Sequence, residues 1–500
     1  MNINRQTRRR ASGLAATALL AITLGAVAPH SSGDALGPVT AITPREVIPN
    51  GFVGAVFNPS LSNRGEAAGV FDSQVQQDAF VFLDAPGQEP MVPGLGLTVS
   101  GNGCVALWAR KNGSTDPQAS VSIGVTDRCA GGERVLYNTN QNYQAGGALA
   151  LSFDGRFGVF REAPCFACEF VPDEIFRIDT QSGALAAMPH HGFPYFGWDS
   201  ALGLDISDDG SVIVAVESGN ASSVAVVDLR DVVAWQVGAP QATFISGNPS
   251  QAPGAGFPSI SGDGRFVAFT SNKPLAAGTT GAGPWVFVTD RSNNALRLVS
   301  PGNASAYQPS ISRDATQIAY AVGSPRLCQF NRQTFAGLEQ GCPGNRIDVA
   351  YGPGPLSTAP ISTETISLGL NNLAAPGLHV EPSLSGNGHF VAWISDAGNA
   401  LVDPADPAFK GLRQAFVRQR DSSIAVDTLN FGTIQAGTSS QLTANVTNTG
   451  HTSIQVDAIT VTPAQFTVQG GGSCVGGMVL PPGGVCTVNV RYAAPVESQP

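Results

Sequence analysis

One short phrase recurs along the chain and constrains its fold more than any other feature. Its clearest copy, residues 258–269, reads Pro-Ser-Ile-Ser-Gly-Asp-Gly-Arg-Phe-Val-Ala-Phe. Close copies begin at Pro59, Pro309 and Pro382, and looser copies begin near residues 97, 149 and 204. The serines that mark the common register lie 38 to 73 residues apart and are Ser62, Ser100, Ser152, Ser207, Ser261, Ser312 and Ser385. Self-similarity at this spacing indicates a repeat architecture.

Each copy predicts a hairpin. A short strand leads into an Asp-Gly or Asn-Gly turn, which accepts positive φ, and a second strand rich in Val, Ala and aromatic residues follows. Further strands are predicted downstream, at residues 79–84, 224–228, 285–290 and 415–419. Four-stranded antiparallel units bury both faces when they stack radially. We therefore predict an all-β fold with a seven-bladed β-propeller, with six or eight blades as alternatives.

The repeated phrase resembles the WD40-like propeller repeats of the TolB type, over about residues 40–420. Some copies depart from the pattern, because Arg64 and Asn102 replace the turn Asp and Ala315 replaces the turn Gly. Relatives of this kind include scaffolds, peptidase gating domains and lyases. The resemblance therefore implies a shape and leaves the activity open.

After Arg420 the phrase does not recur, and strands joined by Gly turns are predicted instead. Residues 421–500 resemble the immunoglobulin-like domains of the choice-of-anchor D and ASPM-SPD2-Hydin type. Such domains usually close with another hairpin after the strand that ends near Tyr492. Either this sandwich is incomplete and presents an open edge, or another segment or chain supplies the last strand.

The first residues are predicted to be an export signal. Arg5 and the arginines at 8–10 precede an uncharged stretch, residues 11–28, which ends in small residues. A membrane anchor is the alternative, but no other run reaches the roughly 18 apolar residues that a spanning helix needs. We predict a signal peptide at 1–28, a propeller at 29–420 and the immunoglobulin-like module at 421–500. The mature chain is then expected to be periplasmic, on the cell surface or extracellular, without a membrane span.

If the chain is exported, its eight cysteines are expected to form disulfides, since disulfides form and persist in an oxidising compartment. Eight thiols permit 105 pairings. Proximity in the sequence favours Cys104 with Cys129, Cys165 with Cys168, Cys328 with Cys342, and Cys474 with Cys486. The Cys165-Phe-Ala-Cys168 spacing also fits a redox or zinc half-site, but no second pair stands at the right distance.

The net negative charge of the chain argues against nucleic acid as a partner. The chain has 27 basic and 37 acidic residues, a formal net charge of -10. Binding to duplex nucleic acid needs a basic face that displaces counterions. We therefore predict that nucleic acid is not a partner.

Compact catalytic motifs are absent from the sequence. It contains no Gly-x-Ser-x-Gly elbow, no phosphate loop and no His-Glu-x-x-His zinc pattern. Residues 205–210, Asp-Ile-Ser-Asp-Asp-Gly, offer several oxygens to Ca²⁺ but lack the spacing of a helix-loop-helix calcium site. We interpret them as a repeat turn, with Ca²⁺ as the alternative, and predict no cofactor.

Residues 189–199 form the most unusual local segment, Pro-His-His-Gly-Phe-Pro-Tyr-Phe-Gly-Trp-Asp. His190, His191, Tyr195 and Trp198 are candidates to stack on a sugar or to grip a peptide. The alternative is that the aromatic side chains fill the gap between neighbouring blades.

The sequence as a whole predicts an exported, monomeric, non-catalytic binding or scaffold protein of the cell envelope or exterior. In this hypothesis, loops over one face of a rigid propeller recognise a protein or a glycan. The alternative is a propeller enzyme, a polysaccharide lyase, a hydrolase or a peptidase-related protein. Such an enzyme would gather its residues at the central funnel from distant blades.

Overall fold

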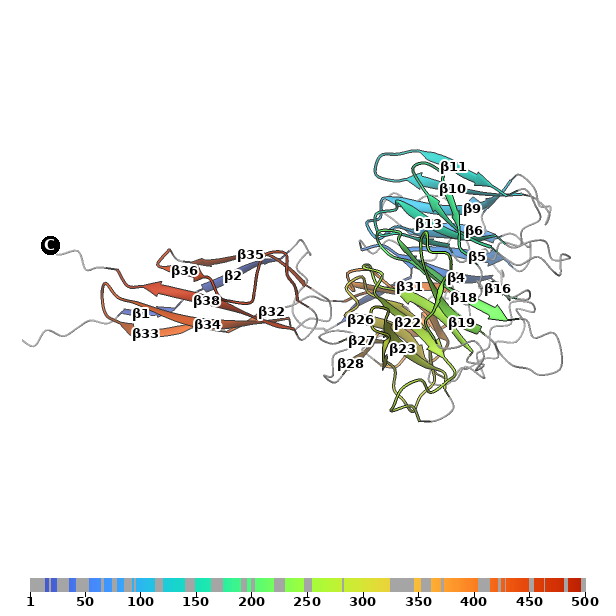
Figure 1. Ribbon diagram of the computed structural model, residues 1–500. Coiled ribbons are helices and arrows are strands. Elements are labelled where there is room, and N and C mark those ends of the chain that lie inside the picture. Colours follow the sequence, from blue (N-terminus) through green and yellow to red (C-terminus); the bar gives the residue numbers. More distant parts are fainter. Residues whose placement is uncertain are drawn as a thin grey trace, which may run out of the picture. The chain divides into compact units, whose positions relative to one another are not determined.

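The chain forms two compact units, and each is described by itself. One comprises residues 34–420, and the other comprises residues 421–500 together with residues 1–33 (Figure 1). The computed structural model describes residues 14–17, 19–24, 36–41, 54–63, 67–73, 79–84, 92–93, 96–112, 120–139, 149–162, 174–189, 196–198, 203–219, 230–246, 254–280, 283–323, 346–351, 361–369, 373–402, 414–420, 424–427, 429–448, 454–462, 464–480 and 484–495.

The larger unit consists of successive antiparallel sheets, which we number as blades 1 to 7. Blades 1 to 3 are β4 (Gly54–Leu61), β5 (Ala67–Ser73), β6 (Ala79–Asp84) and β7 (Val92–Pro93); β8 (Gly96–Val99), β9 (Val105–Lys111), β10 (Val121–Asp127) and β11 (Glu133–Asn138); and β12 (Leu149–Leu151), β13 (Phe157–Glu162), β14 (Glu174–Asp179) and β15 (Leu185–Ala187). Blade 4 has β17 (Leu204–Ile206), β18 (Val212–Gly219), β19 (Arg230–Gln236) and β20 (Thr243–Phe244), with β16 (Phe196–Trp198) as an added strand beside β18.

Blades 5 and 6 follow the same pattern. Their strands are β21 (Ala255–Ile260), β22 (Phe266–Ser271), β23 (Trp285–Asp290) and β24 (Ala295–Leu298), then β25 (Ala306–Ile311), β26 (Gln317–Val322), β27 (Arg346–Tyr351) and β28 (Ser362–Thr365). Blade 7 starts with β29 (His379–Leu384), β30 (Phe390–Ser395) and β31 (Gln414–Arg420), and a short helix, α1 (Gly398–Leu401), lies between β30 and β31.

Blade 7 closes the ring. Its outer strand is β3 (Leu36–Ala41), from the other end of the unit, which pairs antiparallel with β31. Strand β4 of blade 1 contacts β29 and β30 of blade 7, and the N–H of Asn387 in blade 7 donates to Oδ1 of Asn63 in blade 1 at 2.9 Å. The predicted seven-bladed propeller is confirmed.

The repeated phrase folds as a hydrogen-bonded turn. In blade 5, Oγ of Ser261 donates to Oδ1 of Asp263 at 2.5 Å and accepts the N–H of Phe266 at 2.9 Å. Gly264 completes the turn at φ 71°. Each register serine is fully buried. Its hydroxyl accepts a backbone N–H at the end of the inner strand, where water cannot reach that group. Ala315 takes the place of this glycine in blade 6 at φ 58°, so that departure from the pattern keeps the turn.

Apolar side chains fill the spaces between neighbouring blades. Val216 and Val232 of blade 4, for example, belong to one buried cluster with Phe269 and Phe287 of blade 5. The second strands β22 and β26 are almost wholly buried, which explains their near-continuous apolar sequence. The cores that stabilise the ring therefore lie off its axis and leave the axis to other side chains.

The smaller unit is an immunoglobulin-like sandwich. Its strands are β32 (Ile424–Val426), β33 (Asn430–Ile434), β34 (Ser439–Asn448), β35 (Ile454–Thr462), β36 (Phe466–Gln469), β37 (Val479–Leu480) and β38 (Val485–Ala493). Its core contains the aromatic cluster Phe431, Phe466 and Tyr492. The Cys474–Cys486 disulfide belongs to the same core.

Another segment of the chain supplies the edge strands of this module. β1 (Leu14–Thr17) pairs antiparallel with β33, and β2 (Leu19–Leu24) pairs antiparallel with β35. Both strands fall within residues 1–28, so the segment expected to be a signal peptide completes the sandwich in this structure. The signal peptide itself stays a prediction.

Two of the four expected disulfides are present. Cys104 is joined to Cys129 in blade 2, and Cys474 is joined to Cys486. Cys165, Cys168, Cys328 and Cys342 lie outside the described residues. Within the described parts of the chain, no helix has both the length and the apolar composition that crossing a bilayer requires.

Candidate binding cavity

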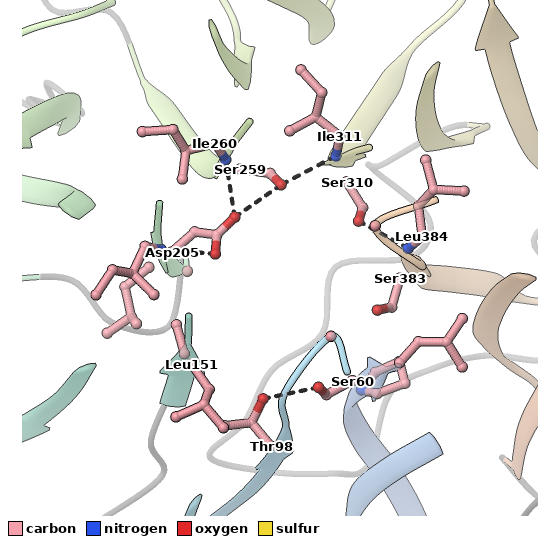
Figure 2. Close-up of a pocket in the computed structure, with 18 of the residues that line it drawn as sticks. Ser60, Thr98, Leu151, Asp205, Ser259, Ile260, Ser310, Ile311, Ser383 and Leu384 are labelled. Carbon is pink, nitrogen blue, oxygen red and sulfur yellow. Dashed lines mark hydrogen bonds between the residues drawn. The ribbon is translucent and has the colours of Figure 1, made fainter. Parts of the chain in front are cut away.

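A cavity of about 340 Å³ lies on the axis of the propeller. The inner strands of all seven blades contribute to its wall, and Figure 2 shows the side chains that surround it. Three layers of residues follow one another along these strands. They are a ring in the wall, a floor at the end where the inner strands finish, and a rim at the end where they begin.

The wall is a ring of equivalent side chains, which we call the hydroxyl ring. It occupies the position two residues before each register serine and consists of Ser60, Thr98, Ala150, Asp205, Ser259, Ser310 and Ser383. Several members accept a backbone N–H from the next blade. Ser259 accepts that of Ile311 at 3.1 Å, and Ser310 accepts that of Leu384 at 2.9 Å (Figure 2). The ring therefore joins neighbouring blades around the axis.

Asp205 is the charged member of the hydroxyl ring. Its Oδ2 accepts the N–H of Ile260 at 2.9 Å and the hydroxyl of Ser259 at 3.1 Å, which joins blade 4 to blade 5. Its Oδ1 accepts the N–H of Ile206 at 2.8 Å. In the pattern of the ring, the residue of blade 3 would accept the N–H of Ile206. That residue is Ala150, which has no acceptor, and Asp205 accepts this N–H instead.

Asp205 is half-buried, and its carboxylate stands in the wall of the cavity. This burial raises the pKa of Asp205 to about 6, although its three hydrogen bonds oppose the shift. Near neutral pH the cavity wall therefore carries a negative charge that titrates close to the physiological range.

The floor consists of the residues that directly follow the register serines. Arg313 of blade 6 forms an ion pair with Asp208 of blade 4, and its Cζ lies 3.9 Å from the ring centroid of Phe153 of blade 3. Burial raises the pKa of Asp208 to about 6, and the Arg313 guanidinium acts against this rise. These three side chains come from three different blades and lie together at this end of the cavity.

Glycines at equivalent positions leave room for the floor. A methyl group at Gly101 would overlap the Phe153 ring, and one at Gly262 would overlap Asp208 and Arg313. The backbone of this layer is joined around the ring, since the N–H of Arg313 donates to the carbonyl of Gly386 at 2.8 Å. Three of the seven positions in this layer are glycine, which leaves space for the side chains of Phe153, Asp208 and Arg313.

The rim includes Gly203, Phe257, Gln308 and Glu381. The last three have φ of 54°, 54° and 52°, and each precedes a proline in a bulge of its inner strand. Such backbone conformations cost about 1 to 3 kcal/mol each and persist where the surrounding structure holds them. They turn the chain at the entrance of the cavity.

The two ends of the propeller differ. We call the end where the inner strands finish the turn face and the other end the loop face. At the turn face the connections are tight, as in residues 180–184 between β14 and β15 and residues 291–294 between β23 and β24. Connections that leave from the loop face are longer, as in residues 323–345 between β26 and β27 and residues 396–413 between β30 and β31.

The predicted ligand segment starts and ends at the loop face of blades 3 and 4. His190, His191 and Tyr195 lie outside the described residues. The backbone of Trp198 belongs to β16 and pairs with Glu217 of β18. No member of this segment is among the described residues that line the cavity.

The carboxylates of residues 205–210 diverge. Asp205 belongs to the hydroxyl ring and Asp208 to the floor. Asp209 accepts the hydroxyl of Ser207 at 2.7 Å and the N–H of Ser211 at 2.9 Å within the repeat turn. Across the described part of the chain, no group of three His, Cys, Asp or Glu side chains is placed to hold a metal ion.

Comparison with known proteins assigns the second unit to a described domain type. Residues 423–498 match the HYDIN/CFA65/VesB-like Ig-like domain. This match confirms the immunoglobulin-like module predicted from the sequence. No curated protein matches the chain.

Solved structures of similar fold are distant in sequence. The β-propeller domain of the Trilobed protease from Pyrococcus furiosus is 9% identical, over 74% of this chain and 97% of that chain, with a TM-score of 0.46. Oligogalacturonate lyase from Vibrio parahaemolyticus is 12% identical, over 82% and 98%, with a TM-score of 0.45. TolB from Acinetobacter baumannii is 12% identical, over 74% and 79%, with a TM-score of 0.36. At such identities the likeness concerns the fold alone.

Proposed function

We propose that this protein is an exported, non-catalytic binding protein of the cell envelope or exterior, which recognises a protein or glycan at the loop face of its propeller. The observation that carries the proposal is the axial cavity. Phe153, Asp208 and Arg313 lie together at one end of it, and we take the rim at the loop face as the entrance for a ligand.

The rigidity of the ring supports a binding role. Hydrogen bonds join the blades in the wall and in the floor, and the inter-blade cores are fully buried. A rigid scaffold holds its surface ready for a partner, which lowers the conformational entropy that binding costs. Export is supported by the Cys104–Cys129 and Cys474–Cys486 disulfides, which persist in an oxidising compartment.

Catalysis at the funnel is the weaker candidate. An enzyme of this shape needs acidic or His side chains within reach of one another and available for proton transfer. Asp205 instead accepts three hydrogen bonds, two from blade 5 and one from its neighbour Ile206, and Asp208 is paired with Arg313. Both carboxylates therefore hold different blades together.

A binding screen tests the proposal. The purified, oxidised protein is applied to a glycan array and to blotted envelope proteins, with Ca²⁺ and with a chelator. We expect saturable binding to one class of ligand. The proposal predicts that Asn303→Arg, an exposed change at the loop face between β24 and β25, weakens this binding. Gln181→Arg, an exposed change at the turn face, is the matched control. Turnover of a polysaccharide or peptide substrate would contradict the proposal.

A further inference from the structure

The charge of Asp205 exceeds what the hydroxyl ring requires. Ser259 and Ser310 join their blades to the next one with neutral hydroxyls, by accepting a backbone N–H at 3.1 and 2.9 Å. Asp205 does the same for Ile260 at 2.9 Å, and in addition it places a carboxylate in the wall of the cavity. An enclosed charge is costly unless an opposite charge compensates it.

Among the described residues that line the cavity, no cation is paired with this carboxylate. The nearby carboxylate of Asp208 raises the pKa of Asp205 further, because it carries the same sign of charge. Strand β21, which packs against Asp205 from blade 5, carries no titratable side chain. Besides Asp205, the charged residues that line the cavity are Asp208, Arg313 and Glu381. Arg313 is engaged with Asp208, so the lining as a whole has an excess of negative charge.

The cavity offers neutral hydrogen-bonding groups beside this charge. Figure 2 shows Ser383 with its hydroxyl toward the middle of the cavity. Among the described residues that hydroxyl makes no hydrogen bond, and Ser310 uses its oxygen only as an acceptor for Leu384. Water occupies about 30 Å³ per molecule, so about 340 Å³ holds on the order of ten waters or one extended side chain.

A metal ion fits this cavity poorly. Hard cations such as Ca²⁺ take six to eight oxygen ligands, usually with several carboxylates in the set. Asp208 and Asp209 are held by Arg313 and by the repeat turn, away from Asp205. A compact cation that needs one carboxylate and a few hydroxyls is the better match, and a primary ammonium group with three donors is such a cation.

We propose that the cavity binds a primary ammonium group, carried by a lysine side chain or an amino terminus of a partner protein, between Asp205 and the hydroxyls of Ser310 and Ser383. This inference rests on the proposed function and names the chemistry of the group that enters from the loop face. Glu381 at the rim attracts the same charge.

The test uses cadaverine as the probe and the neutral diol of the same chain length as its match. Isothermal titration of the full-length protein at about pH 7.5 is expected to show saturable binding of cadaverine and at least about tenfold weaker binding of the diol. Asp205→Ser copies the residue used in other blades and keeps a hydroxyl acceptor for Ile260. We expect it to weaken cadaverine binding about tenfold or more, which is about 1.4 kcal/mol.

Two further variants sharpen the test. Glu381→Gln is expected to weaken cadaverine binding by a smaller factor, because the group stands at the rim. Asp427→Asn removes an exposed carboxylate of the other unit and is expected to leave binding unchanged. If Asp205→Ser does not fold, the pH dependence of cadaverine binding to the wild-type protein tests the inference. Its affinity for cadaverine should fall about tenfold from about pH 7.5 to about pH 5, as Asp205 takes up a proton.

Several results overturn the inference. They are equal binding of cadaverine and the diol, unchanged binding by Asp205→Ser, or an affinity that does not change with pH over this range. If this protein binds a glycan or protein at its loop face but does not bind cadaverine, the inference is overturned and the proposed function stands. Absence of any loop-face ligand together with tight binding of cadaverine would leave the cavity site standing and contradict the proposed function.

Discussion

Arg313 and Asp208 form an ion pair that passes Gly262 of blade 5, from the repeat turn of blade 6 to that of blade 4. Phe153 of blade 3 lies under the guanidinium. The pair stands at one end of a cavity whose wall contains a second aspartate, Asp205. The pair marks the floor of the cavity, opposite the rim that we propose as the entrance.

Removal of Arg313 should destabilise the propeller. Arg313→Ala leaves the Asp208 carboxylate half-buried without its cation, and the pKa of Asp208 should rise further above about 6. Because Arg313 is partly exposed to solvent, we expect a loss of only about 1 to 2 kcal/mol in the free energy of unfolding. Urea denaturation measures it. Arg491→Ala, an exposed change in the other unit, is the control and should leave the propeller transition unchanged.

A methyl group at Gly101 should collide with the floor. Gly101→Ala would push against the Phe153 ring, and we expect a loss of about 1 to 3 kcal/mol. Gly470→Ala is the matched control, since a methyl group there meets open space. Adding Phe153→Leu to Gly101→Ala should recover part of the loss. Additive effects of the two changes would show that the two residues do not touch.

The register serines should each be needed for a turn. Ser261→Ala leaves the N–H of Phe266 without its acceptor and removes the donor to Asp263, at a site with no access to water. We expect a loss of about 1 to 3 kcal/mol, the cost of an unsatisfied buried group. Ser182→Ala, at an exposed turn, should change stability by no more than about 0.5 kcal/mol. Equal effects of the two substitutions would contradict this account of the repeat.

Two arginine–aspartate pairs should make the propeller sensitive to acid. The guanidinium of Arg265 lowers the pKa of Asp290, and that of Arg156 lowers the pKa of Asp179. A carboxyl whose pKa is depressed in the folded state contributes stability above its unfolded pKa, near 4, and loses it as the pH falls toward the folded value. Arg265→Gln should therefore melt below wild type at about pH 7, and the gap should narrow below about pH 4. A gap that is constant down to about pH 2 would contradict the assignment.

The Cys474–Cys486 disulfide should stabilise only the immunoglobulin-like unit. It closes a short loop, with a sequence separation of 12, within a core that includes Phe466 and Tyr492. The chain-entropy estimate for a loop of this size is about 3 kcal/mol. The double substitution to Ser should lower the melting temperature of this unit and leave that of the propeller unchanged, as measured by calorimetry. A shift of both transitions would show that the two units do not unfold separately.

The sequence predicted the propeller well because its repeat is a local structure. The Ser-x-Asp-Gly turn needs only residues that are close in the chain, so Ser261, Asp263 and Gly264 already specify it. Its recurrence then gave seven blades. The role of β3 was not predicted, because its pairing with β31 joins residues that are far apart in the sequence.

The cavity was harder to predict. Asp205 was interpreted as part of a repeat turn, and its position in the wall depends on the alignment of all seven inner strands. The sequence did contain a signal for the cavity. The residues two before and one after each register serine are mostly Ser, Thr or Gly. The larger or charged residues at these positions, which mark the cavity, are Asp205, Asp208, Phe153 and Arg313. The segment of His190, His191, Tyr195 and Trp198 stays a prediction, since His190, His191 and Tyr195 lie outside the described residues.

The most direct test of the account is a comparison of the two faces of the propeller. Asn303→Cys at the loop face and Gln181→Cys at the turn face are both exposed and are each labelled with a bulky maleimide. Binding of the ligand found in the screen is then measured for both proteins. The account predicts that the label at residue 303 weakens binding by at least about tenfold and that the label at residue 181 has no effect. Weaker binding only with the label at residue 181, or no effect of either label, would contradict it.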